Sequence, residues 1–509
     1  MTDPSKNGVG TGFFQPAKPT LWVSAGLVAL FSSLTLIFPT IASSVLASAR
    51  VWTLSQFDWL FAVTPVLALT ACIFFAVSPV GGIRLGGADA QPEFSRASWI
   101  AMLFAAGVGI GFMFYGTTEP LAYYSDWAGA PLATQAGSPE ARRLAFSATL
   151  FHWGLAPWAI YATVGLALGY STYNCNLPLS IRSAFFPIFG DGVFSWRGAL
   201  VDLFATVSTI FGLATTIGIG ATQASAGLSH LIGAEGATAT PYAVIALITG
   251  AAIISVLRGV NDGVRWLSNF NLALALILLA FVVAVGPTID IIAGVARNSV
   301  AYVMDTPALT AWLGRPDVNW FHDWTIFYWA WWISWSPFVG LFIARISKGR
   351  TIREFVVIIL FAPTMIAAIW FTAFGETAIQ QFEAGSGALA GGISDASLTL
   401  FQMLAVLPGA AVTSAIAMAL LIVFIVTSAD SGALVLERLN ATGRDEPSLK
   451  LRVFWTLMLG STAAALLLGG GVSALQTLQA AVIVAALPFT IIIILITLAL
   501  VMALSQQKR

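Results

Sequence analysis

Charged residues are scarce in this sequence. Only 9% of the 509 residues are Asp, Glu, Lys or Arg, and 58% are hydrophobic, whereas an ordinary soluble domain contains about 25% charged residues. A chain of this composition exposes too much apolar surface to stay monomeric in water, which excludes a soluble globular protein. The 23 basic and 23 acidic residues balance, and no nucleic-acid partner is expected.

Cysteine is nearly absent, and long polar stretches are missing. Cys72 and Cys175 have no metal-ligand spacing, so we interpret both as packing residues and expect no metal centre and no cofactor. No polar stretch is long enough for a separate soluble domain. The sequence also lacks a nucleophile beside a base, and His152 alone near a span centre favours a packing role, so an enzyme is not expected. A channel would need a continuous polar lining, which these runs do not offer.

Long apolar runs recur along the whole chain. A run of about 20 apolar residues spans the hydrocarbon core as a helix, and about twelve such runs are present. We predict spans near residues 21–42, 57–80, 97–124, 145–172, 199–231, 240–257, 268–290, 322–346, 355–376, 411–436, 452–470 and 480–504. The segment 291–321 between two of them is expected to include a helix at the outer interface.

The distribution of Lys and Arg predicts the orientation. If the N-terminus is cytoplasmic, 18 of the 23 basic residues lie in cytoplasmic segments, and five lie outside: Arg50, Arg142, Arg143, Arg297 and Arg315. Because basic residues favour the cytoplasmic side, both termini are expected in the cytoplasm. The expected location is a bacterial inner membrane. Residues 505–509 form a short cytoplasmic tail, and little response to osmolality is therefore expected.

The third predicted span contains glycine at every second position, at Gly107, Gly109 and Gly111. This spacing weakens a helix and lets another group approach the backbone closely. Interrupted spans mark transport sites, because their free backbone groups lie near the bilayer midplane. The alternative is that the glycines only allow tight helix packing.

Tryptophan gathers in the eighth predicted span, with five of the chain's 18 tryptophans within twelve residues: Trp324, Trp329, Trp331, Trp332 and Trp335. Packing alone rarely requires several indoles together. The faces of these rings bind a quaternary ammonium, and residues 331 and 335 share one helix face. Trp153, Trp158 and Tyr161 in the fourth span, around Pro157, offer a second wall for such a cage.

Oxygen ligands for a coupling cation are also present. Thr427 and Ser428 in the tenth span are adjacent hydroxyls, the kind of ligand that sodium prefers. The alternative is that both hydroxyls bond to their own helix. Carboxylates near spans are functional candidates, and these are Glu119, Asp202 and Asp430. Each could instead cap a helix or pair with a loop arginine.

Four stretches of this chain resemble the betaine/choline/carnitine transporter family. They are residues 107–120 (GVGIGFMFYGTTEP), 152–161 (HWGLAPWAIY), 324–348 (WTIFYWAWWISWSPFVGLFIARISK) and 427–431 (TSADS). The resemblance implies an all-α membrane protein with twelve transmembrane helices, assembled as a homotrimer in lipid. Two N-terminal helices (1–96) would precede two inverted five-helix repeats of the LeuT-like fold (97–290 and 322–504), with the outer interfacial segment 291–321 between them.

The same resemblance implies roles for individual residues. The substrate box comprises Trp153, Trp158, Tyr161, Trp331, Trp332 and Trp335, with Gly109 and Gly111 of the third span beside it. The carbonyls of Ala105, Val108 and Phe424 and the hydroxyls of Thr427 and Ser428 look like a sodium site, and Phe342 looks like a cytoplasmic gate. For a second sodium site Thr209 and Phe338 remain, but Leu213 replaces its other threonine.

The implied function is a sodium-coupled symporter of a zwitterionic methylammonium or sulfonium solute, most readily glycine betaine, that works by alternating access. Choline-type members resemble one another in an aspartate at the position of Gly111, which this chain lacks. A zwitterion carries its own carboxylate and needs no second anion there. The alternative is a proton-coupled choline transporter, because residues 176–190 and 430–436 look closer to the choline branch.

Overall fold

The computed structural model describes residues 19–107, 109–233, 240–257, 261–440, 448–470 and 474–506. Within these ranges the chain is helical, and the only pairing of extended backbone is an isolated bridge between Arg84 and Thr351. The α-helices are α1 (Pro19–Ile37), α2 (Pro39–Val77), α3 (Arg96–Gly107), α4 (Ile110–Ser125), α5 (Pro139–Trp153), α6 (Leu155–Tyr173), α7 (Phe186–Phe189), α8 (Trp196–Ile232), α9 (Thr240–Leu257), α10 (Asn261–Val285), α11 (Thr288–Thr310), α12 (Val318–Trp320), α13 (Phe327–Ile346), α14 (Ile352–Glu383), α15 (Thr399–Ala405), α16 (Ala410–Asn440), α17 (Leu449–Gly470) and α18 (Ala474–Gln506).

Short tight turns connect several of these helices. They are η1 (Pro79–Gly82), η2 (Pro131–Ala133), η3 (Ile181–Phe185), η4 (Gly190–Phe194) and η6 (Ala388–Gly391). The segment η5 (Phe321–Ile326) is a π-helical turn that leads directly into α13. Such wide turns are frequent at functional sites, and this one leads into the helix that carries the tryptophan cluster.

Each of the twelve apolar runs overlaps described helix, but fewer helices are long and apolar enough to cross a membrane alone. In the described residues eight helices meet that requirement, or nine if α10 and α11, bent by 111° at their junction, count as one span. The third and fourth runs are each divided, into α3 with α4 and into α5 with α6. Most of the helix α11 falls within the segment 291–321, where a helix is expected.

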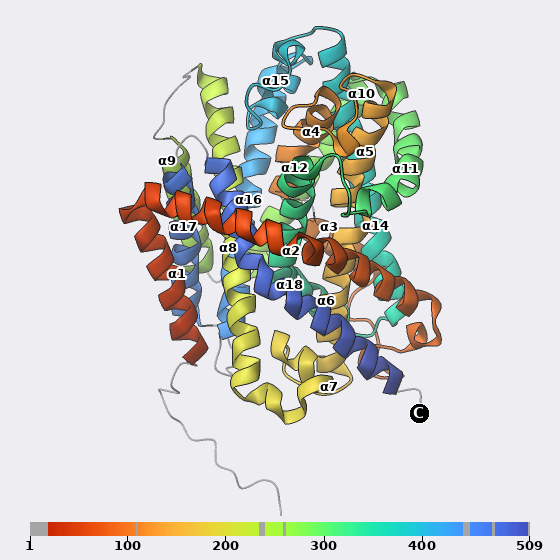
Figure 1. The fold of residues 1–509 in the computed structure, drawn as a ribbon, viewed down its shortest axis with the longest axis vertical. Coiled ribbons are helices and arrows are strands. Elements are labelled where there is room, and N and C mark those ends of the chain that lie inside the picture. The colour runs from red at the N-terminus through yellow and green to blue at the C-terminus, as the bar shows by residue number, and fades with distance from the viewer. Residues whose placement is uncertain are drawn as a thin grey trace, which may run out of the picture.

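Helix α13 lies inside the bundle and packs against α6, α8 and α18. Helix α18 also packs along α2, α14 packs against α4, and α16 packs against α8 (Figure 1). These contacts bring the two halves of the chain together around α13. The aromatic residues of α4, α5, α6 and α13 therefore meet in one buried region.

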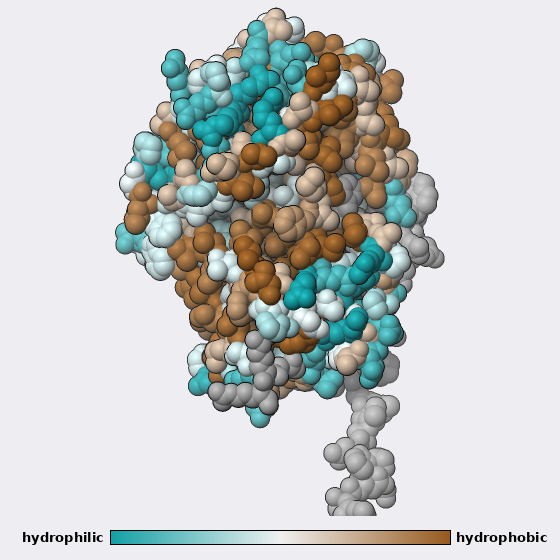
Figure 2. All heavy atoms as spheres, turned by 90° about the vertical axis from the view of Figure 1, so that its right-hand side faces the viewer, coloured by the Kyte–Doolittle hydropathy of each residue, from teal (hydrophilic) through white to brown (hydrophobic). Residues whose placement is uncertain are grey.

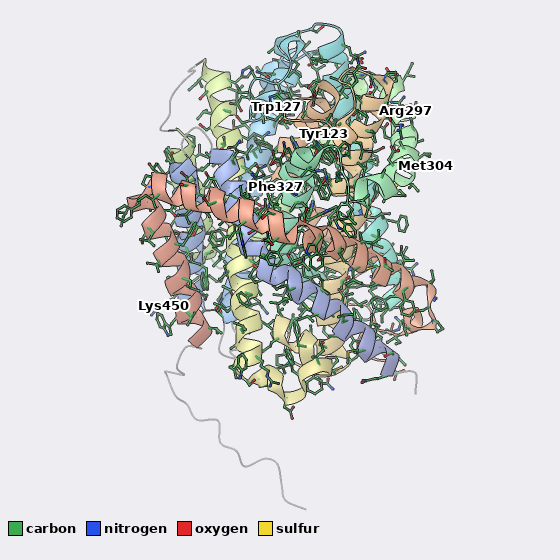
Figure 3. All side chains as sticks on the ribbon, viewed as in Figure 1. Tyr123, Trp127, Arg297, Met304, Phe327 and Lys450 are labelled. Carbon is green, nitrogen blue, oxygen red and sulfur yellow. The ribbon has the colours of Figure 1, made fainter. Side chains whose placement is uncertain are left out.

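The surface agrees with a membrane setting. Large apolar side chains are exposed on several helices, among them Ile289 and Met304 on α11. Figure 2 shows hydrophobic side chains across the middle of one face and hydrophilic ones gathered toward its upper and lower parts. Arg297 lies near the upper end of the molecule, whereas Lys450 lies toward the lower end (Figure 3). An apolar band between two polar ends is the pattern of a protein that spans a bilayer.

Ion pairs between buried carboxylates and partly exposed arginines tie α5, α11 and α14 together near the end that carries Arg297. The fully buried carboxylate of Glu376 on α14 accepts from Arg142 of α5 and, at 2.5 Å, from Arg297 of α11. Arg143 pairs with Asp305 of α11. Because each carboxylate has a basic partner, these pairs position the bent helix α11 against the bundle.

The two cysteines differ in their environment. Cys72 is buried in α2, as a packing residue should be, whereas Cys175 is exposed in the loop after α6. The packing role predicted for Cys175 is therefore wrong. Helix α6 ends at Tyr173, one residue beyond the predicted span 145–172, so Cys175 lies in the loop that follows.

Candidate functional site

The glycine-rich part of the third run interrupts the helix, as predicted. Helix α3 ends at Gly107 and α4 begins at Ile110, with Gly109 in extended conformation at its N-cap. The N–H of Phe112 donates to the Gly109 carbonyl at 3.1 Å, and no side chain of the N-cap residue bonds to the N–H groups of Ile110 and Gly111. Ala105 lies in the last turn of α3, and Val108 lies outside the described residues.

A second interruption occurs in the fourth run at Gly154. Trp153 is the last residue of α5, and α6 begins at Leu155, with Pro157 in its first turn. The backbone N–H of Leu155 donates to the hydroxyl of Tyr302 on α11 at 3.1 Å. The broken helix thus presents Trp153 at a helix end, where its indole reaches residues of both α4 and α13.

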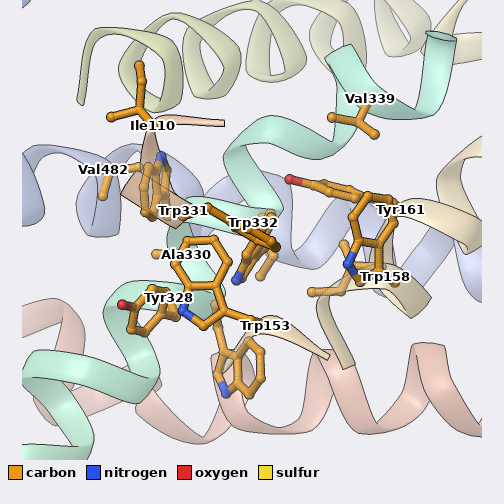
Figure 4. Packing of buried hydrophobic residues seen from close by; sticks show 14 of the residues in the cluster. Ile110, Trp153, Trp158, Tyr161, Tyr328, Ala330, Trp331, Trp332, Val339 and Val482 are labelled. Atoms are coloured by element: carbon orange, nitrogen blue, oxygen red, sulfur yellow. The ribbon is translucent and has the colours of Figure 1, made fainter. Parts of the chain in front are cut away.

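The structure brings most of the predicted box residues into one chain of ring contacts. The ring of Trp153 lies 5.1 Å from Trp332 and 6.2 Å from Trp331, nearly perpendicular to both. Tyr161 lies 5.5 Å from Trp332 and 5.5 Å from Trp158, again edge to face. Figure 4 shows these five side chains together. Three helices, α5, α6 and α13, therefore supply the rings.

Thr216 of α8 fixes two of the tryptophans on α13. Both Trp331 and Trp335 donate their indole N–H groups to its hydroxyl oxygen, at 2.9 and 3.0 Å. The hydroxyl of Thr216 itself donates to the carbonyl of Gly212 at 3.0 Å. One side chain thus sets the orientation of two rings that are four residues apart. Nothing in the sequence pattern distinguishes Thr216 from the other hydroxyl residues of α8.

Glu119 of α4 accepts hydrogen bonds from four side chains although it is fully buried. Its Oε1 accepts from Nδ1 of His152 at 2.8 Å and from the Tyr123 hydroxyl at 3.0 Å. Its Oε2 accepts from the indole N–H of Trp153 at 2.7 Å and from the Tyr328 hydroxyl at 2.5 Å. Four donors compensate for removing a carboxylate from water. Glu119 therefore fixes the orientation of Trp153 through its indole N–H.

His152 has a partner on each ring nitrogen. Its Nε2 lies 2.9 Å from the hydroxyl of Thr325 in η5, while Nδ1 faces Glu119. Its backbone carbonyl accepts the indole N–H of Trp332 at 2.9 Å. His152 is therefore buried with both ring nitrogens satisfied, and it links α5 to α13.

One face of α4 is directed at Trp153. Gly111, Tyr115 and Glu119 follow at intervals of four and share this face. A Cβ atom on Gly111 would lie 2.2 Å from Cη2 of Trp153, closer than two carbon atoms can approach. The indole therefore lies on the backbone of the first turn of α4 while its N–H reaches Glu119, two turns further on. Only glycine at position 111 leaves this space.

The hydroxyl pair of the tenth run lies on the continuous helix α16. The Thr427 hydroxyl donates to the carbonyl of Val423 at 2.8 Å and is 3.1 Å from that of Phe424. Thr427 and Ser428 are both partly exposed. Ile425 of α16 and Ile110 of α4 both border Gly220 of α8, where an added Cβ would lie 2.8 and 3.1 Å from them. The start of α4 and this part of α16 therefore meet the same surface of α8.

The other two carboxylates have basic partners. Asp202 on α8 pairs with Arg182 of η3, whose Nε donates to it at 2.6 Å. Asp430 on α16 accepts from Arg452 of α17 at 2.8 Å and from the Ser255 hydroxyl of α9 at 2.9 Å. Both therefore follow the alternative in which the carboxylate pairs with an arginine. They fix neighbouring helices to one another.

The remaining predicted residues follow α13 and α8. Phe338 and Phe342 lie one and two turns beyond Trp335 on α13, and all three are partly buried. The ring of Phe338 is 5.4 Å from that of Trp335. On α8, Thr209 donates to the carbonyl of Ala205 in its own helix at 2.7 Å. Among the described residues, no group of three or more His, Cys, Asp and Glu side chains could hold a metal ion.

Comparison with known proteins gives consistent matches over nearly the whole chain. The sequence model of a family described as BCCT, betaine/carnitine/choline family transporter, matches residues 19–509. A glycine betaine transporter 1 of Vibrio parahaemolyticus is 45% identical over 498 residues, which are 97% of this chain and 95% of that protein. A glycine betaine/proline/choline/ectoine transporter of the same organism is 44% identical, over 97% and 88% of the two chains. A glycine betaine transporter of Bacillus subtilis is 38% identical, over 96% and 94%.

Proposed function

Because the chain belongs to the betaine/carnitine/choline family of transporters, we propose that it is a symporter that carries glycine betaine into a bacterial cell together with sodium. Membership makes it a transporter of the membrane and not an enzyme. The single observation that carries the substrate proposal is the buried contact of Trp153, Trp331 and Trp332. Indole faces attract a methylated ammonium group, which has no N–H to donate.

A zwitterion is favoured over choline by the residue at position 111. Gly111 lies directly under Trp153, and an aspartate there would have to displace that ring. The ligand's own carboxylate then offsets the charge of its ammonium group. The names of the matched relatives from Vibrio parahaemolyticus and Bacillus subtilis, which are called glycine betaine transporters, support the same substrate. A proton-coupled choline transporter remains the second candidate, because one relative's name includes choline as well as betaine.

Sodium as the coupling ion is supported by hard oxygen atoms near the break between α3 and α4. Thr427 and Ser428, with the carbonyls of Phe424, Ala105 and Val108, form the proposed ligand set. Ile110 and Ile425, neighbours of that break and of that hydroxyl pair, border the same glycine of α8. Phe342, two turns beyond Trp335, is the proposed cytoplasmic gate.

The proposed architecture has twelve transmembrane helices. Residues 1–96 contain two N-terminal spans, residues 97–290 and 322–504 form inverted five-helix repeats of the LeuT-like fold, and 291–321 form the interfacial segment. The interruptions at Gly109 and Gly154 support counting α3 with α4, and α5 with α6, as single broken spans. The proposed assembly is a homotrimer in the inner membrane.

The proposed orientation places both termini in the cytoplasm. The first described residues of α1 and the last of α18 lie toward the same lower part of Figure 1. Lys450, on the predicted cytoplasmic side, also lies toward that part, and Arg297, on the predicted outer side, lies near the opposite end (Figure 3). This separation supports the orientation that the basic residues predict.

Uptake into proteoliposomes tests the proposal. Radiolabelled glycine betaine should accumulate in vesicles only when an inward sodium gradient is applied, and excess unlabelled choline should compete weakly. Trp332→Leu, which removes a ring that contacts both Trp153 and Tyr161, should weaken betaine binding by about 2- to 30-fold, the equivalent of one cation–π contact. Choline uptake driven by a proton gradient, with no betaine uptake, would support the second candidate instead.

A further inference from the structure

Two tyrosine hydroxyls in the described part of the chain are buried and have no hydrogen-bond partner, and both lie in the aromatic region. They belong to Tyr115 on α4 and Tyr161 on α6, whose side chains are 98% and 99% buried. The neighbouring hydroxyls of Tyr123 and Tyr328 both donate to Glu119. Buried polar groups are nearly always paired, so the two free hydroxyls need an explanation.

Tyr115 occupies the middle of the α4 face that meets the box. Its ring lies 6.1 Å from Trp153 and 6.1 Å from Trp331, and Tyr328 is 5.3 Å away. It lies one turn after Gly111, which touches Trp153, and five residues after the start of α4 at Ile110. The partial positive charge of a helix N-terminus acts over its first turn, which in α4 includes Gly111 and ends before Tyr115.

The indole N–H groups of four of the box tryptophans already have acceptors. The indole N–H of Trp153 is bonded to Glu119, that of Trp332 to the carbonyl of His152, and those of Trp331 and Trp335 to Thr216. A ligand carboxylate that took one of these N–H groups would break an existing hydrogen bond. The Tyr115 hydroxyl can donate without such a loss.

We propose that the Tyr115 hydroxyl is the hydrogen-bond donor for the carboxylate of the transported zwitterion. This inference rests on the proposed function and identifies the group that distinguishes a zwitterion from a plain cation. Tyr161 is assigned to the ammonium end, because its ring contacts Trp158 and Trp332 and its hydroxyl points away from the Trp158 ring (Figure 4). A site that pairs a ligand group discriminates strongly against analogues without that group.

Tyr115→Phe removes one oxygen atom and keeps the ring. In fluorescence or calorimetric titrations of the purified full chain, its affinity for glycine betaine should fall by about 10- to 100-fold, the loss of a hydrogen bond to a charged group. Its affinity for tetramethylammonium, which has no carboxylate, should stay within about twofold of wild type. Without ligand, its Tm should be unchanged or raised, because a buried hydroxyl without a partner is removed.

Two single-oxygen controls complete the experiment. Tyr173 lies at the end of α6, and its hydroxyl donates to the Arg345 carbonyl. Tyr173→Phe should retain the wild-type ratio of betaine to tetramethylammonium affinity. Tyr161→Phe should change that ratio less than Tyr115→Phe, and the opposite order would overturn the assignment.

Choline, which has no carboxylate, tests whether the Tyr115 hydroxyl recognises the carboxylate specifically or contacts any polar ligand group. A choline affinity that falls in Tyr115→Phe as much as the betaine affinity would also overturn the assignment. If wild type binds betaine and Tyr115→Phe keeps the wild-type ratio, the inference alone fails. If wild type binds tetramethylammonium but not betaine, the proposed substrate fails, and the inference fails with it.

Discussion

Four tryptophans of the box donate hydrogen bonds to other helices, whereas the Thr427 hydroxyl on α16 donates to its own helix. Trp153 of α5 reaches Glu119 of α4, and Trp331 of α13 reaches Thr216 of α8. Thr427 bonds to Val423, one turn earlier. The box is therefore held in place by contacts between helices, while the hydroxyl of α16 keeps a local bond that it can exchange for another partner.

This difference implies that the aromatic box is formed before any ligand binds, whereas the hydroxyls of α16 can change partner when a ligand binds. A buried indole bonded to a carboxylate can move only if both groups lose a strong, charge-assisted hydrogen bond. A threonine hydroxyl that leaves its i−4 carbonyl gives up a weak local contact, and the helix keeps its backbone bonds. The aromatic region is therefore held more firmly than the α16 hydroxyls, which the proposed sodium site would draw away from their own helix.

The largest expected effect is on stability and follows from replacing Glu119, which accepts four side-chain hydrogen bonds behind the box. Glu119→Leu leaves the donors of His152, Tyr123, Tyr328 and Trp153 without their acceptor, so unfolding free energy should fall by roughly 3–5 kcal/mol. Thermal unfolding in detergent should show a much lower Tm, and betaine binding should be lost with it.

Glu140→Leu is the matched control. Glu140 is exposed at the start of α5, and its one ion pair among the described residues is with Arg143, at 3.5 Å. Such a surface pair contributes little. Its Tm should stay close to wild type. Equal Tm values for both variants would mean that the box does not depend on its buried carboxylate.

An intermediate effect is expected on α16. Thr427→Ala combined with Ser428→Ala removes two hard oxygen ligands, so sodium stimulation of uptake should fall by about tenfold or more, the loss of roughly 1.4 kcal/mol or more of coupling. Betaine binding without sodium should persist, because the rings and their hydrogen bonds are untouched. Uptake and equilibrium binding, each with and without sodium, measure the two effects separately.

Thr413→Ala provides the control on the same helix. Its hydroxyl also bonds to carbonyls of the preceding turn, those of Gly409 and Ala410, but it lies near the start of α16. Sodium stimulation should be retained in this variant. A double variant that still responds fully to sodium would place the ion elsewhere.

The smallest expected effect concerns the contact between Trp153 and α4. In Gly111→Ala the added Cβ would overlap the indole, so the ring must shift and betaine affinity should fall by about fivefold, roughly 1 kcal/mol of overpacking. Gly111→Asp should shift the ring further and move preference toward choline. Competition binding with both ligands measures the change.

Gly26→Ala on α1 is the matched glycine, because nothing lies within 4 Å of its added Cβ. Both affinities should remain at the wild-type level in this variant. Wild-type betaine affinity in Gly111→Ala would contradict the close packing of Trp153 on α4 and would weaken the contrast between a rigid box and an adaptable α16.

Much of the architecture follows from local patterns in the sequence. Apolar runs predict membrane helices because each residue in a bilayer core must satisfy its backbone within its own helix. The alternating glycines at 107, 109 and 111 predict the break before Ile110, because helix propensity is a local property. The four-residue spacing of Trp331 and Trp335 likewise places both indoles on one face, where one acceptor serves both.

The partners of these residues depend on the tertiary structure. Thr216 lies more than 100 residues before the tryptophans that it holds, and Glu119 binds groups from α4, α5 and α13. The sequence marks Glu119 as an intramembrane carboxylate but does not indicate its four donors. Periodicity determines which face of a helix a side chain occupies, whereas the packing of all the helices determines which face it meets. The packing of the helices therefore decided three features: the contact of Trp153 with Gly111, the free hydroxyl of Tyr115 and the local bond of Thr427.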